Sequence, residues 1–272
     1  MDLNNENILQ SCNLLKQKAE ILHVKNSDVE YLQFKELLKY ADKLQHAYSL
    51  KPLQFSDKND KASINYEKIC KTLDIDSNQI IKSAQKHTDI VKDITEYTTE
   101  KFEFVDGFIT NRKNIPLVTK YADCTPIILY DKMKNVIGNV HSGWRGTLQR
   151  ISAKAVKMMI EKYNCNPADI IVCIGPCIKQ CHFQVEGDFI AKFKQEFGNV
   201  EKYYKTGKVI EGKQKYYFDT TNLIIDYLTE IGIKRENIFD SNICSVCNVA
   251  NMYSYRAEKE KSDRNMNIVM LK

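Results

Sequence analysis

Residues 116–146 read PLVTKYADCTPIILYDKMKNVIGNVHSGWRG, and this stretch decides the fold. Its short apolar runs are predicted β-strands, namely Pro116–Lys120, Pro126–Tyr130 and Val136–His141. We expect a helix to follow from about Thr147 to Tyr163, and then another strand at Ile170–Ile174. Hairpins mixed with helices, in place of strict alternation of strand and helix, predict an α+β fold with mixed β-sheets.

Further elements are predicted on both sides of this stretch. Apolar residues at helical spacing indicate an amphipathic helix at the N-terminus, carried by Ile8, Cys12, Leu15, Ala19 and Leu22. The remaining predictions are strands at 31–34, 44–49, 80–85 and 268–271 and helices at 65–73 and 221–231. The last of these helices should end at Gly232 in a left-handed cap.

The composition indicates a soluble globular protein. Of the 272 residues 43% are hydrophobic and 28% charged, and Gly and Pro are scarce, so we expect one domain over residues 1–272. The longest apolar stretches are too short to cross a bilayer, and the N-terminus lacks the layout of a secretion signal. Nine cysteines, an odd number, favour reduced thiols. We therefore expect a cytoplasmic protein, monomeric or homodimeric, with no membrane partner.

The positive charge does not indicate a nucleic-acid partner. The net charge is +5, and the most basic stretch, Glu201–Lys215, interleaves lysines with tyrosines. In a nucleic-acid-binding protein, tyrosines of such a stretch stack on bases and lysines neutralise the phosphates. No nucleic-acid-binding motif accompanies it, so we interpret it as a solvated hairpin that turns near Gly207 or Gly212.

The most distinctive local pattern is HSGWRG at residues 141–146, which joins a predicted strand to a predicted helix. Its two glycines allow a tight turn, and Thr147 is a suitable cap for the helix. Free amides at the helix start, together with the Arg145 guanidinium, would form an anion pocket. A tight connection without further function is the simpler alternative, and the flanking His141 and Arg145 favour a functional site.

A second pattern, YADCTP at residues 121–126, precedes one of the two strands that we expect to form a hairpin. If Lys132 and Met133 are the two turn residues, the residue numbers of directly opposite residues add up to 265. The numbers 124 and 141 also add up to 265. Cys124 and His141 would then lie opposite each other, with Cβ atoms within about 5 Å. A change of one residue in the loop would remove this pairing.

A thiolate and a neutral imidazole are good zinc ligands, and a third ligand would leave the fourth position open, as in catalytic sites. From spacing alone His87 is one candidate for the third ligand. Two alternatives remain open at this point. Cys124 and His141 can form a nucleophile pair, or they can be a buried thiol beside a hydrogen-bonded histidine.

Several motifs in order resemble one family. They are Ala122–Pro126, His141–Thr147, Gly175-Pro176 with Cys181 and Val185, Cys244 with Cys247, and Ser254-Tyr255-Arg256. From about Leu44 to the C-terminus the chain is similar to the purine nucleoside phosphorylases formerly called multicopper polyphenol oxidoreductases or laccase-domain proteins. Residues 1–40 match poorly and form a family-variable N-terminal portion.

The resemblance implies a layered α/β/β/α fold and one zinc held by His87, Cys124 and His141. It also implies phosphorolysis of adenosine, inosine and methylthioadenosine, with adenosine deamination as a side activity. The expected ligands are therefore zinc, a nucleoside and phosphate. Zinc is expected in place of copper, because five histidines cannot supply the four coppers of a multicopper oxidase.

Roles for further residues follow from position in these motifs. We expect Arg145 and the amides of residues 143–146 to bind phosphate, Ser142 to bind the substrate, and Asp123 to move a proton or orient a ligand. Tyr255 and Arg256 would close the pocket. A polyphenol oxidase with one copper, and a non-catalytic nucleoside- or metal-binding module, are the alternative functions.

The chain departs from the family pattern in two places. The family usually has Ser-Thr-Arg and a glycine-rich loop where this chain has Ser49-Leu50-Lys51 followed by Pro52. Lys51 keeps the charge without the two-pronged geometry of arginine, so we expect weaker binding of phosphate or nucleoside. Thr88 stands where a glycine usually follows the third ligand.

The remaining cysteines allow a second metal site. Cys177, Cys181, Cys244 and Cys247 have a spacing that a four-thiolate zinc site can use. The first pair is loosely spaced, and packed reduced thiols are the favoured interpretation. His182 is expected to be a hydrogen-bonded polar group and not a ligand.

Overall fold

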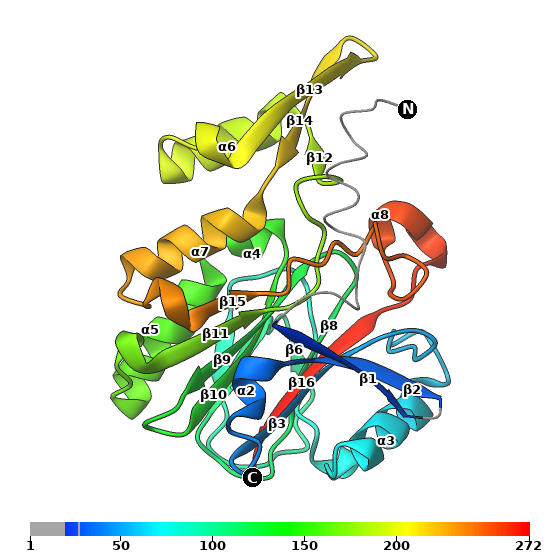
Figure 1. Cartoon of the computed structure of the whole chain (residues 1–272), viewed down its shortest axis with the longest axis vertical. Helices are drawn as coiled ribbons and strands as arrows, with labels where there is room; N and C mark the ends of the chain where they lie inside the picture. Colours follow the sequence, from blue (N-terminus) through cyan, green and yellow to red (C-terminus); the bar gives the residue numbers. More distant parts are fainter. Residues whose placement is uncertain (1–19, 27) are drawn as a thin grey trace.

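The computed structural model describes residues 20–26 and 28–272, and two β-sheets form its centre (Figure 1). The first sheet is antiparallel, in the order β1 (Ile21–Asn26), β2 (Val29–Phe34), β3 (Leu44–Ser49), β16 (Asn265–Leu271) and β8 (Leu117–Tyr121). The second is mixed, in the order β15 (Ile238–Asp240), β11 (Ile170–Ile174), β9 (Thr125–Asp131), β10 (Val136–Ser142), β7 (Gly107–Thr110) and β5 (Val91–Asp93).

Helices and two smaller sheets complete the architecture. The helices are α2 (Lys35–Leu38), α3 (Ala62–Thr72), α4 (Trp144–Leu148), α5 (Ile151–Tyr163), α6 (Gly187–Phe197), α7 (Thr220–Glu230) and α8 (Tyr255–Glu258). The small sheets pair β12 (Gln184–Val185) and β13 (Tyr204–Ile210) with β14 (Lys213–Phe218), and β4 (Ser83–Ala84) with β6 (Phe102–Glu103). No helix in the described part of the chain is both long and apolar enough to cross a lipid bilayer.

Alternation along the strands creates three apolar layers. In β9, Ile127 and Leu129 pack with α5 and α7, whereas Ile128 and Tyr130 pack between the two sheets. On the far side of the first sheet, Ile268 of β16 packs with α3. The result is the expected α/β/β/α arrangement, and the α+β prediction is confirmed.

Several predicted elements need correction. The helix expected from Thr147 to Tyr163 is two helices, because Arg150 adopts a left-handed conformation (φ 57°) between α4 and α5. Gly143, and not Thr147, is the N-cap residue of α4. The strand expected at 80–85 is reduced to the two residues of β4 and a single bridge at Ile81. Of the expected N-terminal helix, Leu22 lies in β1 and the rest lies outside the described residues.

Other predictions are confirmed. Strands β3 and β11 have the predicted bounds, and Gly232 has φ 99° after α7. The basic stretch forms the β13–β14 hairpin, which turns at Glu211 and Gly212 with φ 50° and 73°. Figure 1 shows this hairpin and α6 projecting beyond the two sheets, at the end where α4, β12 and α8 also lie.

A buried polar cluster joins the two sheets. The side-chain amide of Asn139 in β10 donates to the carbonyls of Leu117 and Asn267, at 2.8 and 3.0 Å. Its carbonyl oxygen accepts from Thr119 at 2.8 Å and from the Asn267 side chain at 2.9 Å. Because all these groups are buried, loss of the Asn139 side chain would remove a hydrogen-bond partner from the Thr119 hydroxyl, from the Asn267 amide and from two backbone carbonyls.

We predict that Asn139→Ala lowers the free energy of unfolding by about 2–3 kcal/mol, the cost of leaving buried polar groups unsatisfied. Urea denaturation followed by circular dichroism measures this. Asn251→Ala, at an exposed asparagine, is the control and should change stability by less than about 0.5 kcal/mol. Equal stability of the two variants would show that the cluster does not join the sheets.

Candidate metal centre and its pocket

Three side chains from separate segments converge at one end of the sheets. The ligand atoms of His87, Cys124 and His141 all lie within 4.8 Å of one another, and the two imidazole rings are 5.1 Å apart. His141 belongs to β10, Cys124 directly precedes β9, and His87 lies in the loop after β4. Two imidazoles and a thiol at such distances can hold one metal ion and leave a coordination position open.

The hairpin register differs from the prediction, yet the two ligands still meet. His141 pairs with Pro126, so the residue numbers of opposite residues add up to 267 and not to the expected 265. The turn contains four residues, 132–135, and Asn135 adopts φ 52°. Because side chains alternate with a period of two, a shift of two residues keeps Cys124 on the same face as His141.

Gly143 gives the three ligands the space to approach. A Cβ atom at this position would lie 2.6 Å from Cδ2 of His87 and 3.2 Å from Sγ of Cys124. Both distances are shorter than van der Waals contact. The first glycine of HSGWRG is therefore required by the packing of the ligands against the backbone.

A buried carboxylate, Asp106, organises the site. Its Oδ1 atom lies 2.7 Å from Nδ1 of His141, which leaves Nε2 of that ring for a metal. The same carboxylate accepts the backbone amides of Lys86, His87 and Thr88 at 3.2, 3.1 and 2.9 Å. These bonds hold the loop in which His87 adopts φ 61°, a backbone conformation that is uncommon for residues other than glycine.

Asp106 was not identified from the sequence as a site residue. It precedes β7, and β7 pairs with β10 so that Gly107 lies opposite Val140. Continuing this register places Asp106 beside His141, whose backbone amide donates to the Asp106 carbonyl at 2.7 Å. A correct prediction of the β7–β10 pairing would therefore have identified it.

The electrostatics favour ionised groups at this site. Burial opposes the thiolate of Cys124, but the neighbouring imidazoles outweigh it and lower the pKa of this thiol to about 6. Burial likewise opposes the charged form of His141, but Cys124 and Asp106 raise its pKa to about 9. Near neutral pH without metal, the pair is therefore a thiolate and an imidazolium.

A cavity of about 650 Å³ opens beside the three ligands. Aromatic and apolar side chains form part of its lining, namely Tyr121, Trp144, Ile178, Phe183 and Tyr255. The cationic lining residues are Lys58, Lys86, Lys120, Arg256 and Arg264, against the two carboxylates of Asp57 and Asp123. The excess of positive charge favours an anionic ligand, and the rings offer flat surfaces to a planar group.

Two of the expected substrate-binding residues line this cavity. Tyr255 is 45% exposed, and its hydroxyl donates to Glu260 at 2.8 Å. The Arg256 guanidinium donates to the carbonyls of His182 and Gln184 at 2.9 and 3.2 Å.

Asp123 also lines the cavity, but its carboxylate is engaged within the protein. It accepts the hydroxyls of Ser245 and Ser254 at 2.6 and 2.7 Å and the backbone amide of Arg256 at 2.6 Å. These bonds fasten the start of α8 beside Cys124. The geometry therefore supports a positioning role for Asp123, and its proposed proton transfer stays a prediction.

Three other expected site residues are not among those that line the cavity. Lys51 forms an ion pair with Glu258 at 2.7 Å and donates to the Val249 carbonyl at 2.7 Å. Arg145 is exposed, with its guanidinium stacked 4.4 Å from the Trp144 ring centre. Ser142 is buried, and its hydroxyl is bonded to that of Thr147 at 2.9 Å.

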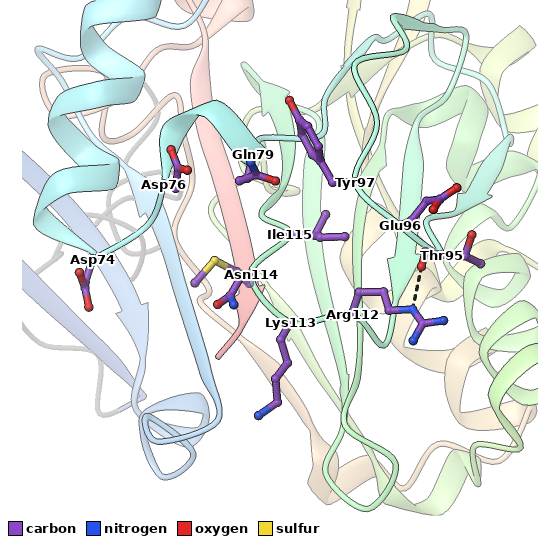
Figure 2. A pocket seen from close by; sticks show the side chains of 11 residues that line it. Asp74, Asp76, Gln79, Thr95, Glu96, Tyr97, Arg112, Lys113, Asn114 and Ile115 are labelled. Carbon is purple, nitrogen blue, oxygen red and sulfur yellow. Dashed lines mark hydrogen bonds between the residues drawn. The ribbon is translucent and has the colours of Figure 1, made fainter.

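A second cavity of about 500 Å³ lacks comparable chemistry (Figure 2). Two of its five charged lining residues are engaged within the protein: Asp76 caps a short helix through the amide of Asn78, and Arg112 donates to the Thr95 carbonyl at 2.7 Å. None of the Cys and His residues of the clustered sites lines it. We therefore take His87, Cys124 and His141, with the cavity beside them, as the candidate functional site.

Comparison with known proteins identifies the family. The model of the family described as multi-copper polyphenol oxidoreductase laccase matches residues 47–272, so the chain belongs to this family. A Bacillus subtilis protein named purine nucleoside phosphorylase YlmD is 28% identical over 229 residues, which cover 81% of each chain. A Borreliella burgdorferi protein named purine nucleoside phosphorylase is 31% identical over 188 residues, covering 68% of this chain and 76% of the relative.

Solved structures show the same fold. The hypothetical protein YfiH of Bacillus licheniformis superposes with a TM-score of 0.81 at 24% identity, covering 92% of this chain and 99% of that one. YlmD of Geobacillus stearothermophilus gives a TM-score of 0.79 at 18% identity, over 93% and 99% of the two chains. The family resemblance inferred from the motifs is thus confirmed.

We predict that Asp106→Asn weakens zinc binding by about 10- to 100-fold, because an amide cannot both accept from His141 and hold the His87 loop. Competition with a chromophoric chelator measures the affinity. Asp131→Asn is the matched control: Asp131 is equally buried, but its carboxylate accepts the turn amides of Met133 and Lys134, at the other end of the β9–β10 hairpin from His141. If both variants bound zinc as the wild type does, Asp106 would not be a positioning residue.

Zinc binding should also depend on pH with a definite sign. Between about pH 6 and pH 9, Cys124 is already a thiolate whereas His141 carries a proton that a metal must displace. Affinity should therefore rise about tenfold per pH unit in this window, rise more steeply below about pH 6, and level off above about pH 9. Calorimetry in buffers of different ionisation enthalpy should report about one proton released per zinc at neutral pH; release of none would contradict the assignment.

Proposed function

We propose that this member of the multi-copper polyphenol oxidoreductase laccase family is a zinc-dependent purine nucleoside phosphorylase. It would convert adenosine, inosine or methylthioadenosine and phosphate into the free base and the sugar 1-phosphate. The names of the B. subtilis and B. burgdorferi relatives support the reaction class. The single observation that carries the proposal is the cluster of His87, Cys124 and His141 at the wall of a cavity rich in cations and aromatic rings.

The residues present fit a zinc ion. Two imidazoles and one thiolate are a ligand set that zinc takes in catalytic sites, and Asp106 supplies the partner that such a histidine usually has. Zinc bound there would polarise an oxygen of phosphate or water at its open position.

The histidines do not support multicopper chemistry. Beyond His87 and His141, His23 pairs with Glu30, His46 accepts from the amide of Phe34, and His182 belongs to a separate cysteine cluster. A multicopper oxidase needs several copper centres with mostly histidine ligands. The chain offers two histidines at this site, so one metal ion is the arrangement that the residues support.

The cavity can position both substrates. Arg256 and Arg264 with Lys86 would attract phosphate, and Phe183, Trp144 and Tyr255 can pack against a purine. Phosphate held in this way would attack the anomeric carbon as the base leaves. Water attacking the purine amino carbon instead would give deamination, which we propose as the side activity.

The test is phosphate-dependent release of the base from inosine or adenosine. We predict activity in the wild type and a loss of at least about 100-fold in Cys124→Ala and His141→Ala, since removal of a metal ligand removes the metal. Base release is followed by chromatography. Binding of nucleoside without any turnover would indicate a non-catalytic module, and oxidation of phenols without phosphorolysis would indicate the oxidase.

Comparison of arginine variants locates the phosphate. We predict that Arg256→Ala raises the KM for phosphate by about 10- to 100-fold, since a hydrogen bond to a charged group contributes about 1.5–3 kcal/mol. Arg145→Ala tests the prediction from the HSGWRG motif in the same assay, and Lys51→Ala tests the residue paired with Glu258. A residue whose variant keeps the wild-type KM for phosphate and for nucleoside is not a binding residue.

A further inference from the structure

A second group of metal-ligating side chains lies outside the cavity of His87, Cys124 and His141. The ligand atoms of Cys181, His182, Cys244 and Cys247 all lie within 4.8 Å of one another. Sγ of Cys181 is 3.8 Å from Sγ of Cys247. Nδ1 of His182 is 3.3 Å from the sulfur of Cys181, 3.7 Å from that of Cys244 and 3.4 Å from that of Cys247.

These distances are the edges of a zinc-centred tetrahedron. Zinc binds sulfur at about 2.3 Å and nitrogen at about 2.0–2.1 Å, so its tetrahedral ligands are separated by about 3.8 Å for two sulfurs and about 3.6 Å for sulfur and nitrogen. The measured 3.8 Å and the measured 3.3–3.7 Å agree with both values. The sulfurs of Cys181 and Cys247 are too far apart for a disulfide, whose length is about 2.05 Å.

The topology explains why these residues meet. Strands β11 and β15 are parallel neighbours, so the loops that follow them leave the same edge of the sheet. The loops continue to pair through a bridge between Cys177 and Cys244, with amide-to-carbonyl bonds of 3.2 Å from Cys177 to Ile243 and 3.0 Å from Ser245 to Cys177. The first loop supplies Cys181 and His182, and the second supplies Cys244 and Cys247.

The structure therefore changes one residue of the four-cysteine zinc site that the sequence spacing allowed. Cys177 is fully buried with its sulfur 3.6 Å from the Thr221 hydroxyl, and it does not belong to the cluster. His182 takes its place, although the sequence favoured a simple hydrogen-bonded role for this residue. Adjacent Cys181-His182 and the Cys-x-x-Cys of 244–247 together supply three thiolates and one imidazole.

We propose that Cys181, Nδ1 of His182, Cys244 and Cys247 form a closed structural zinc site. Four protein ligands fill the tetrahedron and leave no position for a substrate, as in structural zinc sites. The site joins the loop that carries Ile178 and Phe183, which line the cavity, to the loop that leads into α8, whose Tyr255 and Arg256 also line it. On one loop, the His182 carbonyl accepts from Arg256; on the other, Ser245 donates to Asp123, the residue before Cys124. This inference does not depend on the proposed activity.

The experiment removes two of the three candidate ligands beside the cavity and measures how much zinc the protein still binds. Zinc is measured by inductively coupled plasma mass spectrometry, and bound metal by native mass spectrometry, on the His87→Ala/Cys124→Ala double variant. We expect one zinc per chain, where the wild type carries two. Replacement of that zinc by cobalt should give the intense thiolate-to-cobalt absorption and visible bands of a tetrahedral site.

Variants of the second cluster complete the test. In the double-variant background Cys247→Ser should lose the last zinc, and Cys177→Ser, the matched control at the neighbouring buried thiol, should keep it. A double variant that carries no zinc after expression with zinc supplied would overturn the proposal. So would a mass two hydrogens below that of the reduced chain, which indicates a disulfide. Since the double variant leaves the cluster unchanged, the result stands even if Cys247→Ser fails to fold.

Failure of the proposed function would look different. If the cavity binds no metal, the wild type carries one zinc, which His87→Ala/Cys124→Ala retains and Cys247→Ser loses. If the second site is absent, the single zinc of the wild type disappears in His87→Ala/Cys124→Ala.

Discussion

The arrangement of the metal centre depends on one buried carboxylate, that of Asp106. It bonds to the ring of His141 on one side and to three successive backbone amides, from Lys86 to Thr88, on the other. A fully buried carboxylate is stable only when such partners replace water. The requirement to satisfy this charge therefore fixes His87 and His141 relative to each other, and Cys124, directly before β9, completes the candidate metal centre.

The two packed sheets place these parts at one end of the molecule. Asn139 connects β10 to β8 and β16, so the strand that carries His141 is held from the opposite sheet as well. The loop after β11 and the helix α8 line the neighbouring wall. Asp123, the residue before Cys124, accepts from Ser245 and Ser254 of the segment that leads from β15 to α8. The cavity is therefore made from segments that are far apart in sequence and fixed by buried polar contacts.

The sequence was sufficient for elements with a strong local pattern. Strands β3, β9, β10 and β11 follow from apolar runs, and the family motifs were sufficient to group His87, Cys124 and His141, which lie together in the structure. The sequence was insufficient where contacts between distant segments determine the local structure. The left-handed Arg150 divides a helix whose apolar periodicity continues, and the two additional turn residues change the hairpin register. Asp106 and the ligand atom of His182 depend on pairing between distant segments, which no local pattern contains.

The bonds from Asp106 to main-chain amides also affect how this loop can evolve. Every residue except proline has a main-chain N–H group, so residues 86 and 88 can be exchanged for any other residue type while the carboxylate keeps its partners. Thr88 illustrates this: besides its amide, its side-chain hydroxyl adds a further bond to Asp106 at 2.8 Å. Lys86 lines the cavity, so a substitution at this residue can change the cavity wall while His87 remains in place.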